Sequence, residues 1–245
     1  MPAERFFCDQ FFALGDHVLL EEQEFHHAVR VMRLKVGDGI ELVNGQGQLA
    51  RAVFAQVKKH EAQLVINALK SEPKPSFEVI LAQAVPRFNR LDFIVEKGTE
   101  LGITQLWMFP GKLSERDLVA SQHARLRSVA IAAMKQCGRL HLPMIIFKPL
   151  LEKWTEPDLV PSCAAFFGDI KPKAPLFSEA WHQNPPSKGM CFFVGPESGF
   201  TEQEEAKLLK LKAYGVKLHE NILRTDTASL VALSLATHWH LEAAH

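Results

Sequence analysis

The chain has 245 residues, 47% hydrophobic and 23% charged, a composition that indicates a folded globular protein and excludes a disordered or collagen-like chain. Its 28 Lys and Arg side chains balance 28 Asp and Glu side chains, so any nucleic-acid partner has to be held by a local patch and not by net charge. Residues 112–148 form such a patch, with seven basic side chains against Glu115 and Asp117. The basic residues are Lys112, Arg116, Arg125, Arg127, Lys135, Arg139 and Lys148.

The cysteines and histidines indicate neither a metal site nor a redox motif. The four cysteines lie far apart and include no C-x-x-C pair. The paired histidines at 26 and 27 and those near the C-terminus lack a carboxylate or cysteine at metal-ligand spacing. Isolated cysteines fit a reducing compartment, and no uncharged apolar run approaches about 18 residues. We therefore expect a cytoplasmic protein without a membrane segment or a bound metal.

The first part of the chain has the pattern of a small β domain. From residue 5 to about residue 69, short apolar runs alternate with turn signals such as Gly-Asp-Gly at 37–39 and Asn-Gly-Gln-Gly at 44–47, which predicts a small β-barrel or sandwich. Only residues 21–32 favour a helix, because their apolar residues have helical spacing. These apolar residues are Phe25, Ala28, Val29 and Met32.

A linker separates this part from the rest. Residues 70–76 contain two prolines, three charged side chains and no apolar residue. The boundary between two domains, residues 1–72 and residues 73–245, is therefore predicted here.

After the linker, apolar strands alternate with helical patterns, which predicts a mostly parallel sheet covered on both faces. Strands are expected at residues 79–84, 103–109, 145–147, 164–167 and 191–194. Helices are expected at residues 91–101, 121–137 and about 226–241. Gly102 and Gly138 are predicted to end the first two helices, and Ser121 to cap the second.

The sharpest local signal is Cys-Phe-Phe-Val-Gly-Pro-Glu-Ser-Gly-Phe-Thr-Glu-Gln-Glu at residues 191–204. A strand leads into a glycine- and proline-containing turn, and Thr201 with Glu204 forms the capping box of a following helix. Gly195 and Gly199 allow the backbone to approach a ligand closely. A plain strand-to-helix connection explains the same pattern about equally well. The segment is neither a Walker loop nor a G-x-G-x-x-G fingerprint, and the chain has no G-x-S-x-G elbow for a serine nucleophile.

Two further segments contain candidate functional arginines. In residues 221–229, Thr225 or Asp226 is expected to cap the last helix, and Arg224 is either functional or a surface charge. In residues 135–139, Arg139 follows a predicted helix end, where a solvated charge is again the alternative.

Taken together, four segments in this order resemble the RsmE family, the ribosomal RNA small subunit methyltransferases E of the SPOUT superfamily. They are residues 26–47, 90–102, 195–200 (Gly-Pro-Glu-Ser-Gly-Phe) and 223–228 (Leu-Arg-Thr-Asp-Thr-Ala). The chain departs from the family's usual residues at Ala132, Lys135, Cys137, Ser198 and Asp226. The resemblance implies an α/β fold, in which a SPOUT-type trefoil-knotted domain with a mostly parallel sheet follows a small PUA-like β-barrel.

The resemblance also implies an activity. It implies a homodimer that transfers a methyl group from S-adenosylmethionine to N3 of a specific uridine in 16S rRNA of the small ribosomal subunit. The residues that match the family's cofactor loops, with Gly168 the least direct match, are Gly168, Gly195, Pro196, Glu197, Gly199, Leu223, Arg224, Thr225, Thr227 and Ala228.

The chemistry of this reaction points to cationic side chains. Removal of the N3 proton leaves negative charge on the uracil imide, which a nearby cation stabilises, and Arg139 and Arg224 are the candidate catalytic residues. Phosphate contacts that position the RNA are expected from Arg30, Arg33, Arg87, Arg90 and Lys97.

Two alternatives remain at this point. A SPOUT enzyme that methylates a ribose 2′-hydroxyl would share the cofactor loops, although the PUA-like segment and the Arg139 segment argue against it. A non-catalytic RNA-binding protein would share the basic stretch, although the intact cofactor loops argue against that. Binding of S-adenosylmethionine separates the last alternative from the others.

Overall fold

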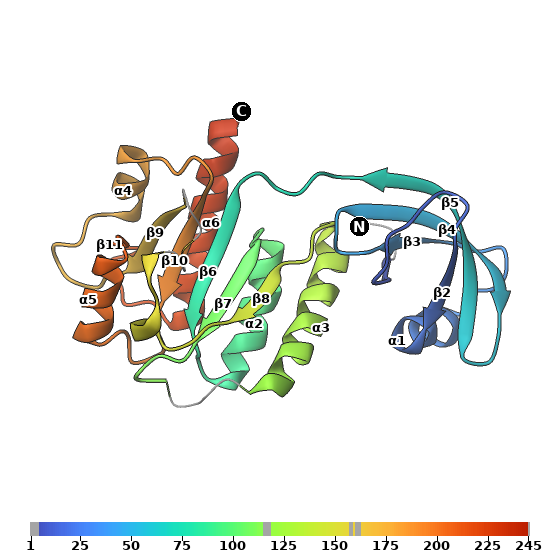
Figure 1. Ribbon diagram of the computed structural model, residues 1–245, viewed down its shortest axis with the longest axis horizontal. Helices are drawn as coiled ribbons and strands as arrows, with labels where there is room; N and C mark the ends of the chain where they lie inside the picture. Colours follow the sequence, from blue (N-terminus) through green and yellow to red (C-terminus); the bar gives the residue numbers. More distant parts are fainter. Residues whose placement is uncertain (1–4, 115–118, 157–158, 160–162, 245) are drawn as a thin grey trace. The chain divides into compact units, whose positions relative to one another are not determined.

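The computed structural model describes residues 5–114, 119–156, 159 and 163–244 (Figure 1). The chain divides into two compact units. The first contains Met1–Lys74 and Ile131–Leu142, and the second contains Pro75–Ala130 and Pro143–His245. Arg116, Glu115 and Asp117 of the predicted basic patch lie outside the described residues.

A five-stranded sheet with the order β1-β3-β4-β5-β2 forms the first unit. Its neighbouring strands are antiparallel, except that β1 and β3 are parallel. The strands are β1 (Arg5–Phe7), β2 (His17–Glu21), β3 (Gly39–Val43), β4 (Gln48–Val57) and β5 (Glu61–Ser71). Irregular pairing between β4 and β5 bends these two long strands, which curves the sheet around its core. The β domain expected from the short apolar runs is thus confirmed.

The core of this unit follows from the alternation of its strands. Along β5, Ala62, Leu64 and Ile66 are buried while the residues between them are not, as period-two alternation requires. The helix expected at residues 21–32 is present in two parts, α1 (Glu22–Phe25) and a π-helical turn, η1 (His26–Val31). Its buried residues include Phe25 and Ala28, which were expected on its apolar face. The π-helical geometry was not predicted.

Residues 131–142 pack into the first unit. Met134 and Leu140 form a small buried cluster with Val43. The backbone N–H of Gly47 donates to the carbonyl of Leu140 at 2.9 Å. A Cβ at Gly47 would lie 2.4 Å from the carbonyl oxygen of Glu72, and the φ of Gly47 is +93°, so only glycine fits here. These contacts fix the segment that contains Arg139.

The second unit contains a six-stranded sheet in which every pair of neighbours is parallel, with the order β11-β9-β10-β6-β7-β8. The strands are β6 (Glu78–Ala84), β7 (Gln105–Phe109), β8 (Met144–Phe147), β9 (Ala164–Gly168), β10 (Gly189–Val194) and β11 (Tyr214–Val216). Five of them were expected at these positions. The short edge strand β11 was not.

Helices cover both faces of this sheet, as the strand–helix alternation predicted. The helices after the linker are α2 (Phe88–Glu100), α3 (Ala120–Cys137), which continues into the first unit, η2 (Leu151–Lys153), α4 (Phe177–Gln183), α5 (Glu202–Lys210) and α6 (Thr225–Ala244). On one face, Ile80, Ala82 and Ala84 of β6 share a buried cluster with residues of η2 and α5. The opposite face lies against α4 and α6, where Phe177 contacts Phe192 and Trp239. Figure 1 shows α6 and α2 beside the sheet.

Several predicted element ends were wrong by one or two residues. Lys70 and Ser71 belong to β5, where they pair with Leu49 and Gln48, so the predicted linker is shorter. Ser121 lies inside α3, which begins at Ala120, and the Gln122 side chain accepts the N–H of Val119 at 3.0 Å instead. Thr225 and Asp226 lie inside α6 rather than capping it, since α6 begins at Thr225. Differences of one or two residues are usual at the ends of helices and strands, which fray.

Candidate active site

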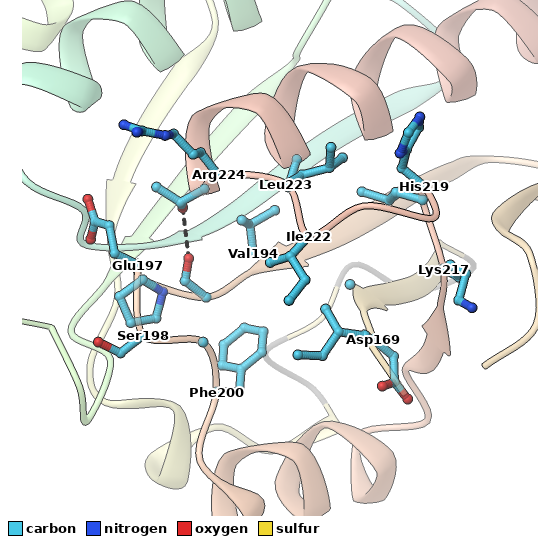
Figure 2. A pocket seen from close by; sticks show the side chains of 18 of the residues that line it. Asp169, Val194, Glu197, Ser198, Phe200, Lys217, His219, Ile222, Leu223 and Arg224 are labelled. Atoms are coloured by element: carbon cyan, nitrogen blue, oxygen red, sulfur yellow. Dashed lines mark hydrogen bonds between the residues drawn. The ribbon is translucent and has the colours of Figure 1, made fainter. Parts of the chain in front are cut away.

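A cavity of about 700 Å³ lies at the carboxyl ends of β9, β10 and β11 in the second unit (Figure 2). Loops that follow these three strands line it: residues 168–170, 195–200 and 217–225, with Arg87 and Arg90 at its edge. In α/β sheets of this kind the carboxyl ends of the strands are where ligands bind. The cavity is also large enough for a nucleoside-sized ligand.

The loop after β10 has a folded-back backbone that depends on its glycines. Gly199 has a φ of +75°, and its N–H donates to the carbonyl of Pro196 at 2.9 Å. A Cβ at Gly195 would lie 3.0 Å from the carbonyl carbon of Gly199. Gly199 is favoured by its backbone conformation, and Gly195 by the lack of space for a side chain. Without these side chains the main chain of the loop stays accessible from the cavity.

The capping box predicted after this loop is confirmed. Glu204 is buried, and its carboxylate accepts hydrogen bonds from the N–H and the hydroxyl of Thr201, both at 2.9 Å. The hydroxyl of Thr201 accepts from the N–H of Glu204 at 3.2 Å. The other carboxylate oxygen accepts the N–H of Lys112 at 3.0 Å. One buried carboxylate therefore fixes both the start of α5 and the loop after β7.

The loop after β11 forms the opposite wall. Lys217 pairs with the segment before α4, since its N–H donates to the carbonyl of Pro175 at 2.8 Å. Ile222 is 79% exposed, a large fraction for an apolar side chain on the wall of a cavity. Figure 2 shows Ile222 and Phe200 around the same space, with Glu197 and Ser198 on one side and Asp169 on the other. The cavity walls therefore combine apolar side chains with carboxylate and hydroxyl side chains.

Two contacts connect the start of α2 to the cavity. The backbone N–H of Arg87 donates to Oε1 of Glu197 at 3.1 Å. Nη1 of Arg90 donates to Oδ2 of Asp226 at 2.5 Å. Both arginines line the cavity edge, so the N-terminus of α2 is joined to the loop after β10 and to the start of α6.

The structure brings together nearly all of the predicted cofactor-loop residues. Those that line the cavity are Gly168, Gly195, Pro196, Glu197, Gly199, Leu223, Arg224, Thr225 and Ala228. Thr227 is exposed and lies outside the lining formed by the described residues. The two candidate catalytic residues belong to different compact units, because Arg224 lines the cavity of the second and Arg139 lies in the first. Burial lowers the pKa of Arg139.

Other lining residues were not predicted from the sequence. Asp169 and Ile170 follow β9, and residues 217–222 follow the unpredicted β11. Gln83 is fully buried in β6 and hydrogen-bonds to residues of α6. Its signal in the sequence is a single amide among the apolar residues of positions 79–84. Within the described residues, no group of three or more His, Cys, Asp or Glu side chains is placed to hold a metal ion, and no helix is long and apolar enough to cross a membrane.

Comparison with known proteins extends over almost the whole chain. Ribosomal RNA small subunit methyltransferase E of Bacillus subtilis is 29% identical over 224 residues, which cover 86% of each protein. The protein of the same name from Mycobacterium tuberculosis is 26% identical over 254 residues, covering 99% of this chain and 96% of the relative. The crystal structure of the Neisseria gonorrhoeae protein of that name, bound to S-adenosyl methionine, has a TM-score of 0.84 at 27% identity and covers 97% of this chain and 98% of that one.

The fold and the cavity at the strand ends therefore define an α/β RNA methyltransferase with a PUA-like domain, as the sequence resemblance implied. The family described as RNA methyltransferase domain matches residues 72–237, and the one described as RNA methyltransferase PUA domain matches residues 20–67. The chain belongs to the RNA methyltransferase family. The resemblance to the RsmE family is confirmed by these relatives.

Proposed function

We propose that the chain methylates N3 of a specific uridine in 16S rRNA of the small ribosomal subunit, with S-adenosylmethionine as methyl donor. The observation that carries this proposal is the cavity at the strand ends, which gathers nine of the ten predicted cofactor-loop residues. Likeness to the relatives named for small-subunit rRNA methylation supports the substrate. Methyl transfer requires mainly that the methyl carbon and uracil N3 are held in line, with little covalent chemistry from the protein. A cavity lined largely by residues of three loops fits this role.

The residues present fit this cofactor. A Cβ added at Gly168 or Gly199 would meet no atom within 4 Å, so both loops leave open space where a ligand is to be held close to the backbone. Val194 and Leu223 supply apolar surface for an adenine ring, and the loops at 195–200 and 217–224 supply backbone donors and acceptors. Bound there, S-adenosylmethionine supplies an electrophilic methyl group on a sulfonium.

The protein's own part in the reaction is to orient the uracil and to stabilise its imide charge. Arg224 is exposed and lines the cavity, so its guanidinium can approach a base presented at the opening. Arg139 is the second candidate catalytic residue and is half-buried within the first unit. A guanidinium donates hydrogen bonds in a fixed plane, which suits the carbonyl oxygens that flank N3.

RNA binding is assigned to side chains in both parts of the chain. We take residues 1–72 as the RNA-binding PUA-like domain and residues 73–245 as the methyltransferase domain. Arg30 and Arg33 are exposed in the former. In the latter, Arg87 and Arg90 line the cavity edge, whereas Lys97 lies 2.8 Å from carboxylates of Glu96 and Glu100, which raise the pKa of Lys97.

Salt dependence tests these contacts. Binding of 16S rRNA fragments should weaken steeply with salt, and Arg33→Ala should reduce the log–log slope by about 0.7 to 0.9 for a lost phosphate contact. Lys97→Ala should change the slope less, since two carboxylates already neutralise that ammonium group. An unchanged slope in Arg33→Ala would remove that residue from the contact surface.

The atom that is methylated tests the function itself. Small subunits from a strain that lacks this modification are incubated with the protein and S-adenosylmethionine, the RNA is mapped by reverse transcription and its nucleosides are weighed. Methylation at N3 removes the imino donor of base pairing, so a strong stop at one uridine with the added mass on the base is expected. Added mass on the ribose would support the 2′-O alternative. Cofactor and RNA binding without any added mass would support a non-catalytic RNA-binding protein.

We also propose that the protein is a homodimer that acts in the cytoplasm on ribosomal subunits. Leu230, Val231 and Leu241 project from the incompletely buried side of α6, where Leu241 is 56% exposed. Light scattering at micromolar concentration should give twice the mass of one chain, and Val231→Glu should halve it. Leu209→Glu, at a 60% exposed position of α5, is the matched control. A wild-type monomer would contradict the proposal.

A further inference from the structure

A buried polar relay connects the two main loops of the cavity. Gln83 of β6, Thr225 and Ser229 of α6 are all buried, and Gln83 and Ser229 are fully so. Nε2 of Gln83 lies 3.0 Å from Oγ1 of Thr225, which lies 2.8 Å from the carbonyl oxygen of Gly195. The chain of contacts thus runs from the centre of the sheet, through the first residue of α6, to the loop after β10.

Donor and acceptor chemistry fixes the direction of the hydrogen bonds between Gly195, Thr225 and Gln83. The carbonyl of Gly195 only accepts, so the single hydroxyl hydrogen of Thr225 is directed to it. The oxygen of that hydroxyl is then free to accept from the amide of Gln83. This places the NH₂ group of Gln83 toward Thr225 and Ala84, whose carbonyl it meets at 2.9 Å. Oε1 of Gln83 faces Ser229, whose Oγ lies 2.6 Å away.

The amide orientation therefore follows from donor and acceptor matching alone. Each polar atom of the Gln83 side chain has a partner, and Ser229 additionally lies 2.9 Å from the carbonyl oxygen of Thr225. A fully satisfied buried network specifies one arrangement of the groups around it, because any other leaves a polar group without a partner in a low dielectric. Here the network fixes the position of Gly195, in the loop after β10, relative to the start of α6, which follows the loop after β11.

We propose that Gln83 is a positioning residue that sets the distance between the two cofactor loops through the hydroxyl of Thr225. This inference rests on the proposed function, and Gln83 does not itself line the cavity formed by the described residues. Loss of the hydroxyl at Thr225 removes the donor to the Gly195 carbonyl and leaves the NH₂ group of Gln83 with the Ala84 carbonyl but without its link to α6. The loop after β10 is then free to separate from Arg224, and cofactor affinity falls while the rest of the unit stays folded.

The test is a set of isothermal titrations with S-adenosylmethionine and its demethylated product at a temperature where every variant is folded. Thr225→Val has nearly the same volume without the hydroxyl and should weaken binding about tenfold, as should Gln83→Met. Thr225→Ser retains the hydroxyl and should bind within about twofold of wild type. The double variant Thr225→Val with Gln83→Met should bind the cofactor as tightly as the single variant of lower affinity, because both changes break the same hydrogen-bond network.

A matched control separates positioning from stability. Thr99 is fully buried in α2 of the same unit, and its hydroxyl donates to the carbonyl of Val95 at 2.7 Å. Thr99→Val should lower the melting temperature and leave cofactor affinity unchanged. If Thr225→Val and Gln83→Met lower the melting temperature without changing affinity, or if their effects simply add, the relay has no positioning role. Wild-type protein that fails to bind the cofactor would instead overturn the proposed function.

Discussion

Arg90 and Asp226 form a short ion pair across 136 positions of sequence, with Nη1 of Arg90 2.5 Å from Oδ2 of Asp226. The Asp226 side chain is only 9% exposed, whereas that of Arg90 is 29% exposed. Asp226 also accepts the N–H of Thr227 at 3.0 Å. The pair therefore joins the starts of α2 and α6 at the cavity edge, and the guanidinium that was predicted to bind phosphate has a structural role as well.

Replacement of Arg90 should consequently have two separable effects. Arg90→Ala leaves a nearly buried carboxylate without its partner and should destabilise the protein by about 1–3 kcal/mol in urea unfolding. A phosphate contact by Arg90 predicts in addition weaker RNA binding with a smaller salt slope. The double variant Arg90→Ala with Asp226→Asn removes the unpaired charge, so it should recover stability but not RNA affinity. Recovery of both would show that Arg90 acts on RNA only through the fold.

Gly168 offers a steric test of the cavity. A Cβ at this position meets nothing within 4 Å, and its φ lies outside the left-handed region, so Gly168→Val is expected to fold normally. Its side chain would occupy space at the cavity wall and should weaken S-adenosylmethionine binding at least tenfold. The cofactor at about 100 times its Kd should stabilise wild-type protein by roughly 2.7 kcal/mol, an effect that Gly168→Val should largely lose.

The control for this variant is Gly39→Ala in the first unit, where a Cβ would be 3.9 Å from the nearest atom. It should retain both the fold and the cofactor-induced stabilisation. Gly195→Val is a less informative probe, because its side chain would press on the backbone of Gly199 and change folding and binding together. Normal cofactor binding by Gly168→Val would exclude the loop after β9 from the site.

Local patterns predicted most of the strands and helices, because periodicity and end signals act over a few residues. Gly102 and Gly138 follow α2 and α3 with φ of +92° and +87°, as their positions after apolar runs indicated. The loop glycines and the capping box of Thr201 and Glu204 were predictable for the same reason. Each of these features depends on contacts within one turn of the chain.

The features that local patterns did not predict depend on contacts between residues far apart in the sequence. The relay from Gln83 to Thr225 spans 142 positions, and no spacing rule relates the two residues. The edge strand β11 has only three residues and is defined by pairing with β9. The π-helical turn η1 has the same apolar pattern as an ordinary helix. Sequence resemblance, by contrast, predicted nine of the residues that line the cavity, but not Asp169, Ile170 or residues 217–222.

The cysteines provide a pH-dependent prediction. Burial raises the pKa of both Cys8 and Cys163 to about 11, and burial also raises the pKa of Cys191 well above its usual value. The thiolate is the reactive form of cysteine. A pKa raised from 9.0 to about 11 lowers the thiolate fraction about a hundredfold at pH 8. Native protein should therefore be alkylated slowly by iodoacetamide at these positions, and faster as the pH rises toward 11. Peptide mass mapping against urea-unfolded protein measures this, and equal rates in both states would contradict the burial of these thiols.

The two candidate catalytic arginines are expected to act on the chemical step and not on cofactor binding. If a guanidinium stabilises the imide anion, its removal should lower kcat with little effect on cofactor affinity, because the charge exists only after N3 loses its proton. Arg224→Gln and Arg139→Gln should each lower kcat about 10²- to 10³-fold, the usual cost of one lost oxyanion donor. The lysine variants should retain more activity than the glutamine variants, since they keep the charge but lose the planar pair of donors. The loss should also shrink at alkaline pH, where more of the uracil is already deprotonated and less stabilisation is required. Single-turnover rates on 16S rRNA between pH 7 and pH 9.5 measure this, with cofactor titrations as the control. A variant that loses cofactor binding and kcat in parallel, with the same loss at every pH, would assign that arginine to binding and not to the chemical step.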